Sequence, residues 1–429
     1  MNIYLMFCNG LTTLGKIKKT TMKIGIVGGS IAGCSAAILL HKEGHEVTVF
    51  ERSSKTLVGR GGGIGTTSSL MEQIKTDRLI KDDFALFQIN KMPLVGKAPS
   101  HEPYGKKAWA IPMNFNVFQW NELWKNLRRN VPNKLYRAGV KIVDAKCLPQ
   151  GQVELTTSLG NTEHFDLVLF ADGYQSLGRK LMFPEKKLKY RGYILWRGLL
   201  KESEMDGDCP LKDEILRLSY TGEPGHNVVY FIPDQNGSVK KGQRVFNWAA
   251  YIAIPEAELD NVMTDKTGRL RNGTLPPGNL SEANESMLKR FLSQHIPTYY
   301  AKVVNKTKDS YIQVIYTLDL DSYYKDNMCL IGDAGMVVQP FTGSGVFKGY
   351  NNAKDLIANL KETHTIDDAL ERWSNQQLKT GKKLLALGEQ MEKAFIWEQI
   401  DFAKVGKDET KKWWKASVTF PDNFNYERD

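Results

Sequence analysis

Cysteine is scarce in this chain of 429 residues, and its five cysteines are far apart and form no Cys-x-x-Cys pair. An odd number of isolated cysteines argues against a disulfide scaffold and is typical of free thiols in a reducing compartment. The seven histidines are also scattered, and none falls in a His-Glu-x-x-His motif. We therefore expect neither structural disulfides nor a metal site.

Long hydrophobic runs are missing as well. No stretch approaches the length that a helix needs to cross a bilayer, so we expect no transmembrane segment. Residues 1–22 place a short apolar patch before their lysines, which is the reverse of the order in a secretory signal. We interpret residues 1–22 as a dispensable N-terminal extension and expect a cytoplasmic protein. A homodimer is left open.

Nucleic-acid-binding signatures are absent, although the chain is basic with a formal net charge of +10. No zinc finger, helix-turn-helix or aromatic RNA-binding motif accompanies the lysines and arginines, so we expect no nucleic acid partner. The basic stretch after residue 400 predicts a solvated face. A positive surface also attracts anionic cofactors or substrates, without identifying them. The length of the chain favours two domains.

The sequence does contain one complete βαβ unit, which begins directly after Met22. A β-branched strand, a glycine-rich turn, a helix rich in small residues and a second strand follow one another. The turn reads Gly28-Gly29-Ser30-Ile31-Ala32-Gly33, and Glu51 ends the second strand. Such a turn directs a helix N-terminus at a pyrophosphate, and the carboxylate can accept hydrogen bonds from a ribose. Ser30 replaces the middle glycine of the usual fingerprint, and its hydroxyl can donate to a phosphate. A tight turn without a ligand is the alternative.

Two aspartates follow buried strands further along the chain. Asp172 comes after the strand at 166–171, and Asp333 lies within the segment that follows the strand at 328–332. Ligands of α/β sheets lie beyond the carboxyl ends of the strands, where an aspartate can accept from ribose or ribitol hydroxyls. Capping of a turn is the alternative role for either residue. A segment Pro340-x-x-Gly343-Ser344-Gly345 then opens a helix, and its amides would face an anionic group such as the N1/O2 edge of reduced flavin.

Between these segments the pattern changes to separate strands with turns or polar loops between them, which predicts an antiparallel sheet. These strands are 193–200, 215–220, 227–232, 244–254 and 311–318. We therefore predict an α/β fold in which a Rossmann-like domain is interrupted by a mainly antiparallel β-sheet domain. The Rossmann-like domain comprises residues 23–184 and 322–375, the sheet domain residues 185–321, and a C-terminal helical region residues 376–429.

The motifs together resemble the class A flavoprotein monooxygenases, which are single-component enzymes that hydroxylate aromatic rings. The resemblance covers most of residues 23–360 and implies a fold of the p-hydroxybenzoate hydroxylase type. It implies that residues 23–184 and 322–375 form the FAD-binding domain and residues 185–321 the substrate-binding domain. It rests on the glycine turn with Glu51, on Ala171-Asp172-Gly173-x-x-Ser176, and on Gly332-Asp333-Ala334 with Pro340-x-x-Gly343-x-Gly345.

A finer resemblance is to the 2,6-dihydroxypyridine 3-hydroxylase branch of this class. Three segments carry it, namely residues 193–198, 226–233 and 244–248, together with the Gly-Gly-Ser form of the turn. The chain departs from that branch at Gln339-Pro340-Phe341, where the branch has Arg-Pro-His. The substrate of the branch is therefore not carried over.

The resemblance implies an FAD- and NAD(P)H-dependent monooxygenase that hydroxylates an aromatic or N-heteroaromatic substrate. NADH or NADPH would reduce FAD, O₂ would add at flavin C4a, and the resulting hydroperoxide would hydroxylate the ring. The flavin carries this chemistry, which fits the absence of a catalytic triad from the sequence. The FAD-binding residues that we predict are Gly28, Gly29, Ser30, Ile31, Ala32, Gly33, Glu51, Arg52, Gly63, Gln119, Asp172, Asp333, Pro340, Gly343, Ser344 and Gly345.

The predicted sheet should roof the flavin, so residues on its strands are candidates for substrate contact. They are Tyr230, Pro233, Asn247 and Trp248. An ordinary packed sheet face is the alternative, because strands favour aromatic and β-branched residues in any case. His226 is a candidate general base, and a purely structural histidine is the alternative.

Two other functions compete with hydroxylation. An FAD-dependent reductase or halogenase on the same scaffold is one, although the Trp-x-Trp-x-Ile-Pro run of flavin halogenases is missing from the chain. A non-catalytic protein that binds an aromatic ligand is the other. It would bind that ligand without consuming NAD(P)H.

Overall fold

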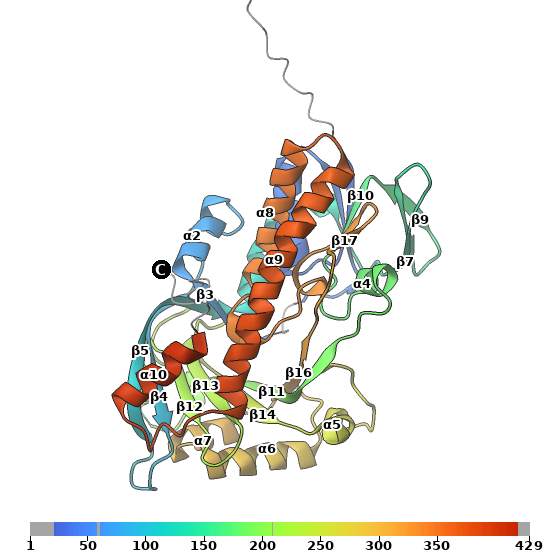
Figure 1. The fold of residues 1–429 in the computed structure, drawn as a ribbon. Helices are drawn as coiled ribbons and strands as arrows, with labels where there is room; N and C mark the ends of the chain where they lie inside the picture. The colour runs from blue at the N-terminus through green and yellow to red at the C-terminus, as the bar shows by residue number, and fades with distance from the viewer. Residues whose placement is uncertain (1–20, 58–60, 208, 419–429) are drawn as a thin grey trace, which may run out of the picture.

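The structure, a computed structural model, describes residues 21–57, 61–207 and 209–418 (Figure 1). Residues 1–20 of the predicted N-terminal extension lie outside this part, as do residues 419–429 of the predicted helical region. The described chain forms two units, each with its own sheets and its own apolar core.

The first unit contains a six-stranded sheet in which neighbouring strands pair in parallel, except for β17 at one edge. Its inner strands are short, mostly apolar runs that are buried on both faces, as is usual for parallel sheets covered by helices, whereas the two edge strands are partly exposed. The order across the sheet is β17 (Tyr324–Lys325), β18 (Met328–Leu330), β10 (Leu167–Phe170), β1 (Lys23–Val27), β2 (Glu46–Glu51) and β6 (Tyr136–Ala138). A small three-stranded sheet belongs to the same unit and consists of β7 (Ile142–Cys147), β8 (Val153–Thr157) and β9 (Thr162–Phe165).

The second unit is a nine-stranded sheet in which only β12 and β4 pair in parallel. Its order is β15 (Thr274–Leu275), β16 (Tyr311–Thr317), β11 (Lys189–Lys201), β14 (Val245–Ala253), β13 (Gly225–Ile232), β12 (Leu216–Ser219), β4 (Phe87–Gly96), β5 (Lys106–Gln119) and β3 (Gly63–Thr67).

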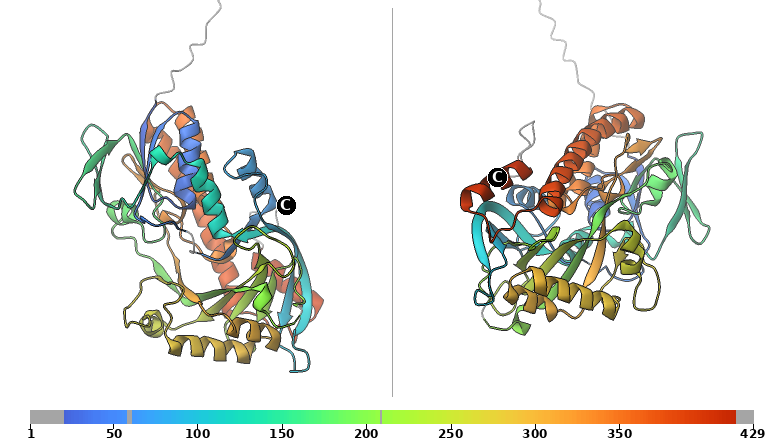
Figure 2. Two further views of the ribbon diagram at one scale, coloured as in Figure 1. Left: turned by 180° about the vertical axis from the view of Figure 1, so that it is seen from behind. Right: turned by 60° about the horizontal axis from the view of Figure 1, so that its bottom comes forward.

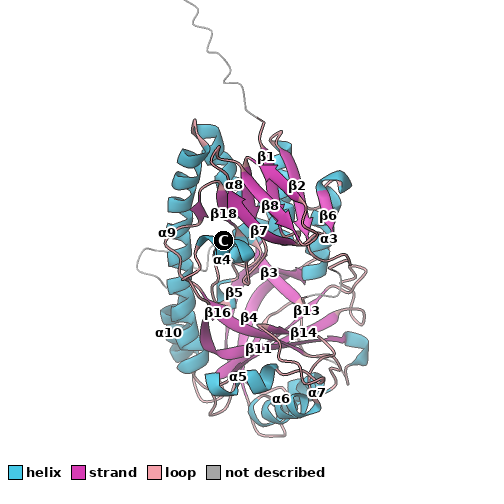
Figure 3. Cartoon of the chain, turned by 90° about the vertical axis from the view of Figure 1, so that its right-hand side faces the viewer, coloured by secondary structure: helices cyan, strands magenta, loops and turns pink. Residues whose placement is uncertain are grey.

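Helices cover both sheets. Two of them, α6 and α7, lie across the outer side of the large sheet (Figure 2). The long helix α9 runs beside both units, from the six-stranded sheet down to the large sheet (Figure 3). The helices are α1 (Ile31–Lys42), α2 (Ser68–Thr76), α3 (Trp120–Asn130), α4 (Leu177–Met182), α5 (Glu256–Met263), α6 (Glu282–His295), α7 (Thr298–Asn305), α8 (Phe347–Glu362), α9 (Ile366–Glu392) and α10 (Lys407–Val418).

The strand register divides the large sheet into two faces, because side chains alternate along a strand. Trp248 lies on the outer face, where its Nε1 donates to Oγ1 of Thr307 just beyond α7, at 2.9 Å. Asn247 and Tyr251 point to the opposite face, and Tyr251 contacts Phe341 of the first unit there. We call this the inner face; it includes Asn247, Ala249 and Tyr251 of β14, their partners Tyr230, Val228 and His226 of β13, and Tyr193, Leu195 and Arg197 of β11.

The predicted α/β fold, with a Rossmann-like unit interrupted by an antiparallel sheet, is confirmed. The predicted boundaries differ from the sheets in two places. Residues 63–119 supply β3, β4 and β5 to the large sheet, although we assigned them to the FAD-binding domain. The predicted boundary at 375 falls inside α9. The first difference arises because pairing between distant strands, and not local sequence, decides to which sheet a strand belongs. The second arises because one uninterrupted helix of 27 residues continues past the predicted boundary.

Candidate functional site

The three predicted motifs meet at the carboxyl ends of neighbouring strands. β18, β10 and β1 lie side by side in parallel, so the segments that follow them share one edge of the sheet. A Cβ atom added to Gly28 would overlap the carbonyl of Ala171, and one added to Gly332 would lie 2.9 Å from the Cβ of Ala32. The motifs are therefore in contact and form one continuous site.

The glycine turn is built for close approach of backbone to backbone. Gly28 has a φ of +109°, and a Cβ atom at Gly33 would overlap the carbonyl oxygen of Gly28. Both positions therefore require glycine. The far side of the turn is fixed by Trp124 and Tyr136, whose Nε1 and hydroxyl each donate to the carbonyl of Gly29 at 3.0 Å. The turn is rigid before any ligand arrives.

Ser30 and Glu51 flank the turn as predicted. Ser30 is the N-cap of α1 and makes no side-chain capping bond, so its hydroxyl and the first amides of α1 suit an anionic ligand. Glu51 is buried, and its two carboxylate oxygens accept from the N–H groups of Gly29 at 2.9 Å and Ser53 at 2.8 Å. Each oxygen retains a second lone pair for a ribose hydroxyl. Arg52 is exposed beside Glu51.

Asp172 lies at the next strand end, before α4. Its Oδ2 accepts from the N–H of Leu177 at 2.7 Å, whereas its buried Oδ1 has no hydrogen-bond partner in the described part of the chain. Burial raises the pKa of this carboxyl above its ordinary value. A buried acceptor without a hydrogen bond lowers the stability of the folded protein, so this oxygen is suited to accept from a hydroxyl or N–H of a ligand.

Asp333 lies at the third strand end and is half exposed, with 51% of its side chain accessible. Its Oδ1 is 2.6 Å from Nζ of Lys348, a buried lysine that also donates to the carbonyl of Met336 at 2.7 Å. Asp333 is therefore held in place from α8 while its other oxygen remains accessible. The segment Pro340–Gly345 follows as a short turn with Gly343 in the left-handed conformation, and Oγ1 of Thr342 lies 2.8 Å from Oγ of the predicted Ser344.

The inner face of the large sheet meets β3 at the predicted Gly63. The N–H of Gly63 donates to Oδ1 of Asn247 at 2.8 Å, and Nη2 of Arg197 donates to the carbonyl of Gly63 at 2.5 Å. A Cβ at Gly63 would lie 2.8 Å from the ring of Tyr230. The structure thus brings two of the substrate candidates, Tyr230 and Asn247, together beside a predicted flavin contact.

Arg197 is a half-buried cation, and no carboxylate of the described residues pairs with it. Its other hydrogen bond goes from Nη1 to Oε1 of Gln313 at 3.2 Å, and its buried Nε has no hydrogen-bond partner among those residues. The hydroxyl of Tyr311 is buried and likewise lacks a partner there, and the guanidinium lies 5.8 Å from the centre of the Tyr311 ring. Buried donors are ordinarily hydrogen-bonded, so this arrangement favours an anionic or oxygen-rich ligand.

His226 lies at the other end of the inner face. Its Nδ1 is 3.1 Å from the carbonyl oxygen of Phe395 and therefore carries the proton, which leaves the buried Nε2 as an acceptor without a partner within residues 21–57, 61–207 and 209–418. Its ring stacks on Tyr251 with centroids 4.6 Å apart. Burial, together with the charge of Arg217, lowers the pKa of His226 well below its ordinary value. A histidine in this state is a neutral acceptor and a poor general base.

The remaining predicted residues lie elsewhere. Nε2 of Gln119 donates to the carbonyl of Pro233 at 2.6 Å, which joins β5 to the end of β13. Trp248 lies on the outer face under α7, so the structure does not bring it to the inner face with Asn247. Adjacent residues of one strand point to opposite faces, and only one of the two can face the flavin.

A cavity of 160 Å³ adjoins this site. It lies between the Asp333 and Pro340 segments and the large sheet, and its lining includes Leu195, Gln313 and Tyr316. A larger hollow of 530 Å³ lies at the far end of α1 from the glycine turn. Several of its charged groups pair with one another, as in the ion pairs of Lys354 with Asp77 at 2.9 Å and of Lys361 with Glu43 at 2.8 Å, and none of the motifs lines it.

The cysteines of the described residues, Cys34, Cys147, Cys209 and Cys329, are free thiols. No group of three or more histidine, cysteine or acidic side chains in that part of the chain could hold a metal ion. Of the helices that the structure describes, none combines the length and the apolar character needed to cross a membrane.

Sequence reasoning missed several residues that hold the site. Arg179 joins two of the motifs, because its Nη1 donates to the carbonyl of Ala334 at 2.8 Å. Lys348 forms an ion pair with Asp333, and Arg197 places a positive charge on the inner face. A lysine in a helix and an arginine in a strand carry no local signal of burial. Only the apolar residues on both sides of Arg197 suggested a buried strand position.

Comparisons with known proteins agree with this geometry. A family model described as an NAD(P)-binding Rossmann-like domain matches residues 26–60, and one described as FAD binding domain-like matches residues 190–317. The 2,6-dihydroxypyridine 3-monooxygenase of Paenarthrobacter nicotinovorans is 26% identical over 85% of this chain and 89% of its own length. The kynurenine 3-monooxygenase of Christiangramia forsetii is 21% identical over 77% of this chain and 70% of its own length.

Solved structures show the same fold. The 2,6-dihydroxypyridine-3-hydroxylase from Arthrobacter nicotinovorans superposes with a TM-score of 0.79 at 23% identity, over 89% of this chain and 95% of its own. Klebsiella pneumoniae HpxO, solved with FAD and uric acid, superposes with a TM-score of 0.69 at 16% identity, over 92% of each chain. The predicted resemblance to FAD-dependent monooxygenases is confirmed by these relatives.

Proposed function

We propose that this chain, an FAD-dependent monooxygenase, uses NADH or NADPH and O₂ to hydroxylate an aromatic or N-heteroaromatic ring that carries an ionisable oxygen. One observation carries the proposal. Three predicted FAD motifs meet at adjacent strand ends, and across from them lies a sheet face with a half-buried arginine that no carboxylate of the described residues pairs with. The matching FAD binding domain-like family model and the FAD complex of HpxO support FAD as the cofactor, and the monooxygenase relatives support oxygen insertion as the reaction.

The residues at the strand ends fit FAD. The amides of the glycine turn and Ser30 would hold the pyrophosphate, Glu51 the adenosine ribose, and Asp333 the ribityl chain. The carboxyl oxygen of Asp172 that lacks a partner offers a further acceptor. When bound and reduced, the flavin supplies the activation of O₂ and the transfer of one oxygen atom.

The inner face fits a substrate with an anionic oxygen. The Nε–H of Arg197 and the hydroxyl of Tyr311 are buried donors that a phenolate or hydroxypyridine anion would satisfy. A cation beside the hydroxyl group lowers its pKa and favours the anion. The anion makes the ring electron-rich, which is the form that an electrophilic oxygen attacks. His226 adds a neutral acceptor at the other end of this face for an N–H or O–H donor.

The described cysteines are all free thiols, which is usual for a protein of a reducing compartment. From these thiols alone we infer a cytoplasmic location.

The test is a screen of phenols, hydroxypyridines and larger hydroxylated aromatics against the purified protein. We expect a yellow protein, substrate-stimulated oxidation of NADH or NADPH, equal consumption of O₂, and a product heavier by one oxygen atom. Oxidation of NAD(P)H without oxygen in the organic product would instead indicate a reductase. Ligand binding without any oxidation would indicate a binding protein.

A further inference from the structure

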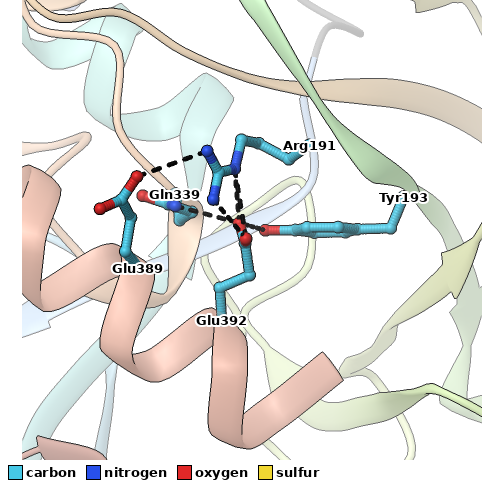
Figure 4. A network of polar contacts seen from close by, with 5 residues as sticks. All are labelled: Arg191, Tyr193, Gln339, Glu389 and Glu392. Carbon is cyan, nitrogen blue, oxygen red and sulfur yellow. Dashed lines mark hydrogen bonds and ion pairs between the residues drawn. The ribbon is translucent and has the colours of Figure 1, made fainter. Parts of the chain in front are cut away.

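Two departures from regular structure meet at one side chain near the end of α9. The register between β11 and β16 shifts between Tyr190 and Ile194, and α9 passes after Glu392 into a single π-helical turn, Lys393–Trp397. Bulges and π-turns are frequent beside active sites because they redirect side chains. Arg191, in the shifted part of β11, and Glu392 point toward one another here (Figure 4).

Glu392 is a buried carboxylate with three partners. Its Oε1 accepts from Nη2 of Arg191 at 2.6 Å, and its Oε2 accepts from the hydroxyl of Tyr193 at 3.1 Å and from Nε2 of Gln339 at 3.0 Å. Only 5% of its side chain is exposed. The partners come from β11 and from the segment before Pro340, so one carboxylate ties α9 to the large sheet and to the first unit.

Gln339 is the partner that reaches the cofactor site. It is fully buried and directly precedes the predicted flavin segment Pro340–Gly345. Its side chain is held by Glu392, and its main-chain carbonyl accepts from Oγ1 of Thr342 at 3.0 Å. A Cβ atom on Gly388 would overlap Oε1 of Gln339, so α9 comes close enough only because this position is glycine.

Phe341 anchors the same segment from its other side. Its ring stacks on Tyr193 at 6.1 Å with an interplanar angle of 17°, and it also packs on Tyr251 at 4.9 Å and on Phe395 at 5.5 Å. Phe395 belongs to the π-turn, and its carbonyl fixes the tautomer of His226. The end of α9 therefore contacts both the flavin segment and the inner face.

We propose that Glu392 is a positioning residue for the flavin segment Pro340–Gly345, acting through Gln339, and that the C-terminal helical region thereby completes the cofactor site. The inference rests on the proposed function, because it takes this segment to face the flavin. Amide dipoles act on a flavin only at a fixed distance and direction. A segment that is free to shift binds the flavin less tightly. Reduced flavin then more often reacts with O₂ to give oxidised flavin and hydrogen peroxide, without hydroxylating the substrate.

The first test compares Glu392→Gln with Glu389→Gln in the FAD-loaded full-length protein. Glu389 lies on the same helix and contacts the same arginine at 3.4 Å, but it is half exposed and does not touch Gln339. We expect Glu392→Gln to raise the dissociation constant for FAD about ten-fold, since one charge-assisted hydrogen bond is lost. We also expect a shifted flavin absorption band and a larger share of NAD(P)H oxidation that ends as hydrogen peroxide. Glu389→Gln should match the wild type in all three.

The second test removes the link from the other side. Gln339→Leu leaves the ion pair of Glu392 with Arg191 intact, and we expect it to reproduce the flavin shift even if Glu392→Gln folds poorly. The double variant Glu392→Gln with Gln339→Glu returns a carboxylate and an amide to this contact, and it should recover FAD affinity to within about three-fold.

The proposal is overturned if Glu392→Gln and Gln339→Leu keep the wild-type flavin band, FAD affinity and peroxide share. It is also overturned if Glu392→Gln lowers only the melting temperature, which would make the network a structural ion pair. Failure of the proposed function would look different. The wild-type protein would then put no oxygen into any product, whereas the comparison of flavin bands would still stand.

Discussion

The glycine turn and the inner face of the large sheet are two halves of one site, and they present different groups to a ligand. The turn offers backbone amides and is fixed by the absence of side chains at Gly28 and Gly33. The inner face offers side chains from strands that are far apart in the chain, among them Arg197 and Tyr311. Backbone amides recognise a pyrophosphate in many proteins in which a glycine turn opens a helix. Side-chain recognition is particular to one substrate.

The largest expected effect comes from filling the turn. Gly33→Val would force a side chain into the carbonyl of Gly28, so we expect complete loss of FAD binding, seen as colourless protein with no flavin released on denaturation. Gly406→Ala is the matched control, because a Cβ there meets nothing within 4 Å. A yellow Gly33→Val protein would show that the turn does not hold the cofactor.

The second-largest effect is expected from a change that affects the inner face and leaves the glycine turn intact. Arg197→Met removes the unpaired cation of the inner face, and we expect substrate-stimulated NAD(P)H oxidation to fall about a hundred-fold while FAD stays bound. Steady-state kinetics and the flavin-to-protein ratio measure the two separately. Lys201→Met, an exposed change on the same strand, should leave both unchanged. Equal loss of FAD in Arg197→Met would mean that the halves are not separable.

A smaller effect is expected where a side chain supports the cofactor half. Lys348→Met releases Asp333 from its ion pair of 2.6 Å, and we expect FAD affinity to fall about ten-fold by fluorescence titration. Lys354 lies more than one turn further along α8 and pairs with Asp77 instead, so Lys354→Met is the matched control. Its FAD affinity should stay at the wild-type value, and a matching fall in both variants would refute the role of Lys348.

The smallest effect concerns the apo protein. Burial raises the pKa of the Asp172 carboxyl in the folded protein. The contribution of this carboxyl to the free energy of unfolding is therefore greatest below about 3.9, its pKa in the unfolded chain, and it is lost as pH rises through the raised pKa of the folded protein. Asp172→Asn should therefore raise the melting temperature of the apo protein at pH 7, on the order of 1–2 °C, and the gain should vanish toward pH 4. FAD affinity should fall in the same variant. Asp144→Asn, at an exposed site, is the control for both measurements.

The two halves also differ in how far the sequence predicts them. The βαβ unit, Asp172 and Asp333 follow from local patterns, because a turn and a strand end are local structures. The inner face depends on how the sheet packs, which the sequence leaves open. Alternation along β14 sends Asn247 and Trp248 to opposite faces, but only the packing of Trp248 on Thr307 and of Tyr251 on Phe341 shows which face lies toward the first unit. The contact of Glu392 with Arg191 joins residues about two hundred positions apart, and no local pattern reports it.

The order of the strands in the chain has a consequence for how the protein is made. The cofactor edge needs β1, β10 and β18, and β18 begins only at Met328, after the whole large sheet. Before β18 has been made, the nascent chain exposes the edge of β10 that β18 covers in the folded sheet. The three motifs can hold FAD together only after this strand has joined, and a ligand that binds the folded state stabilises the protein from then on.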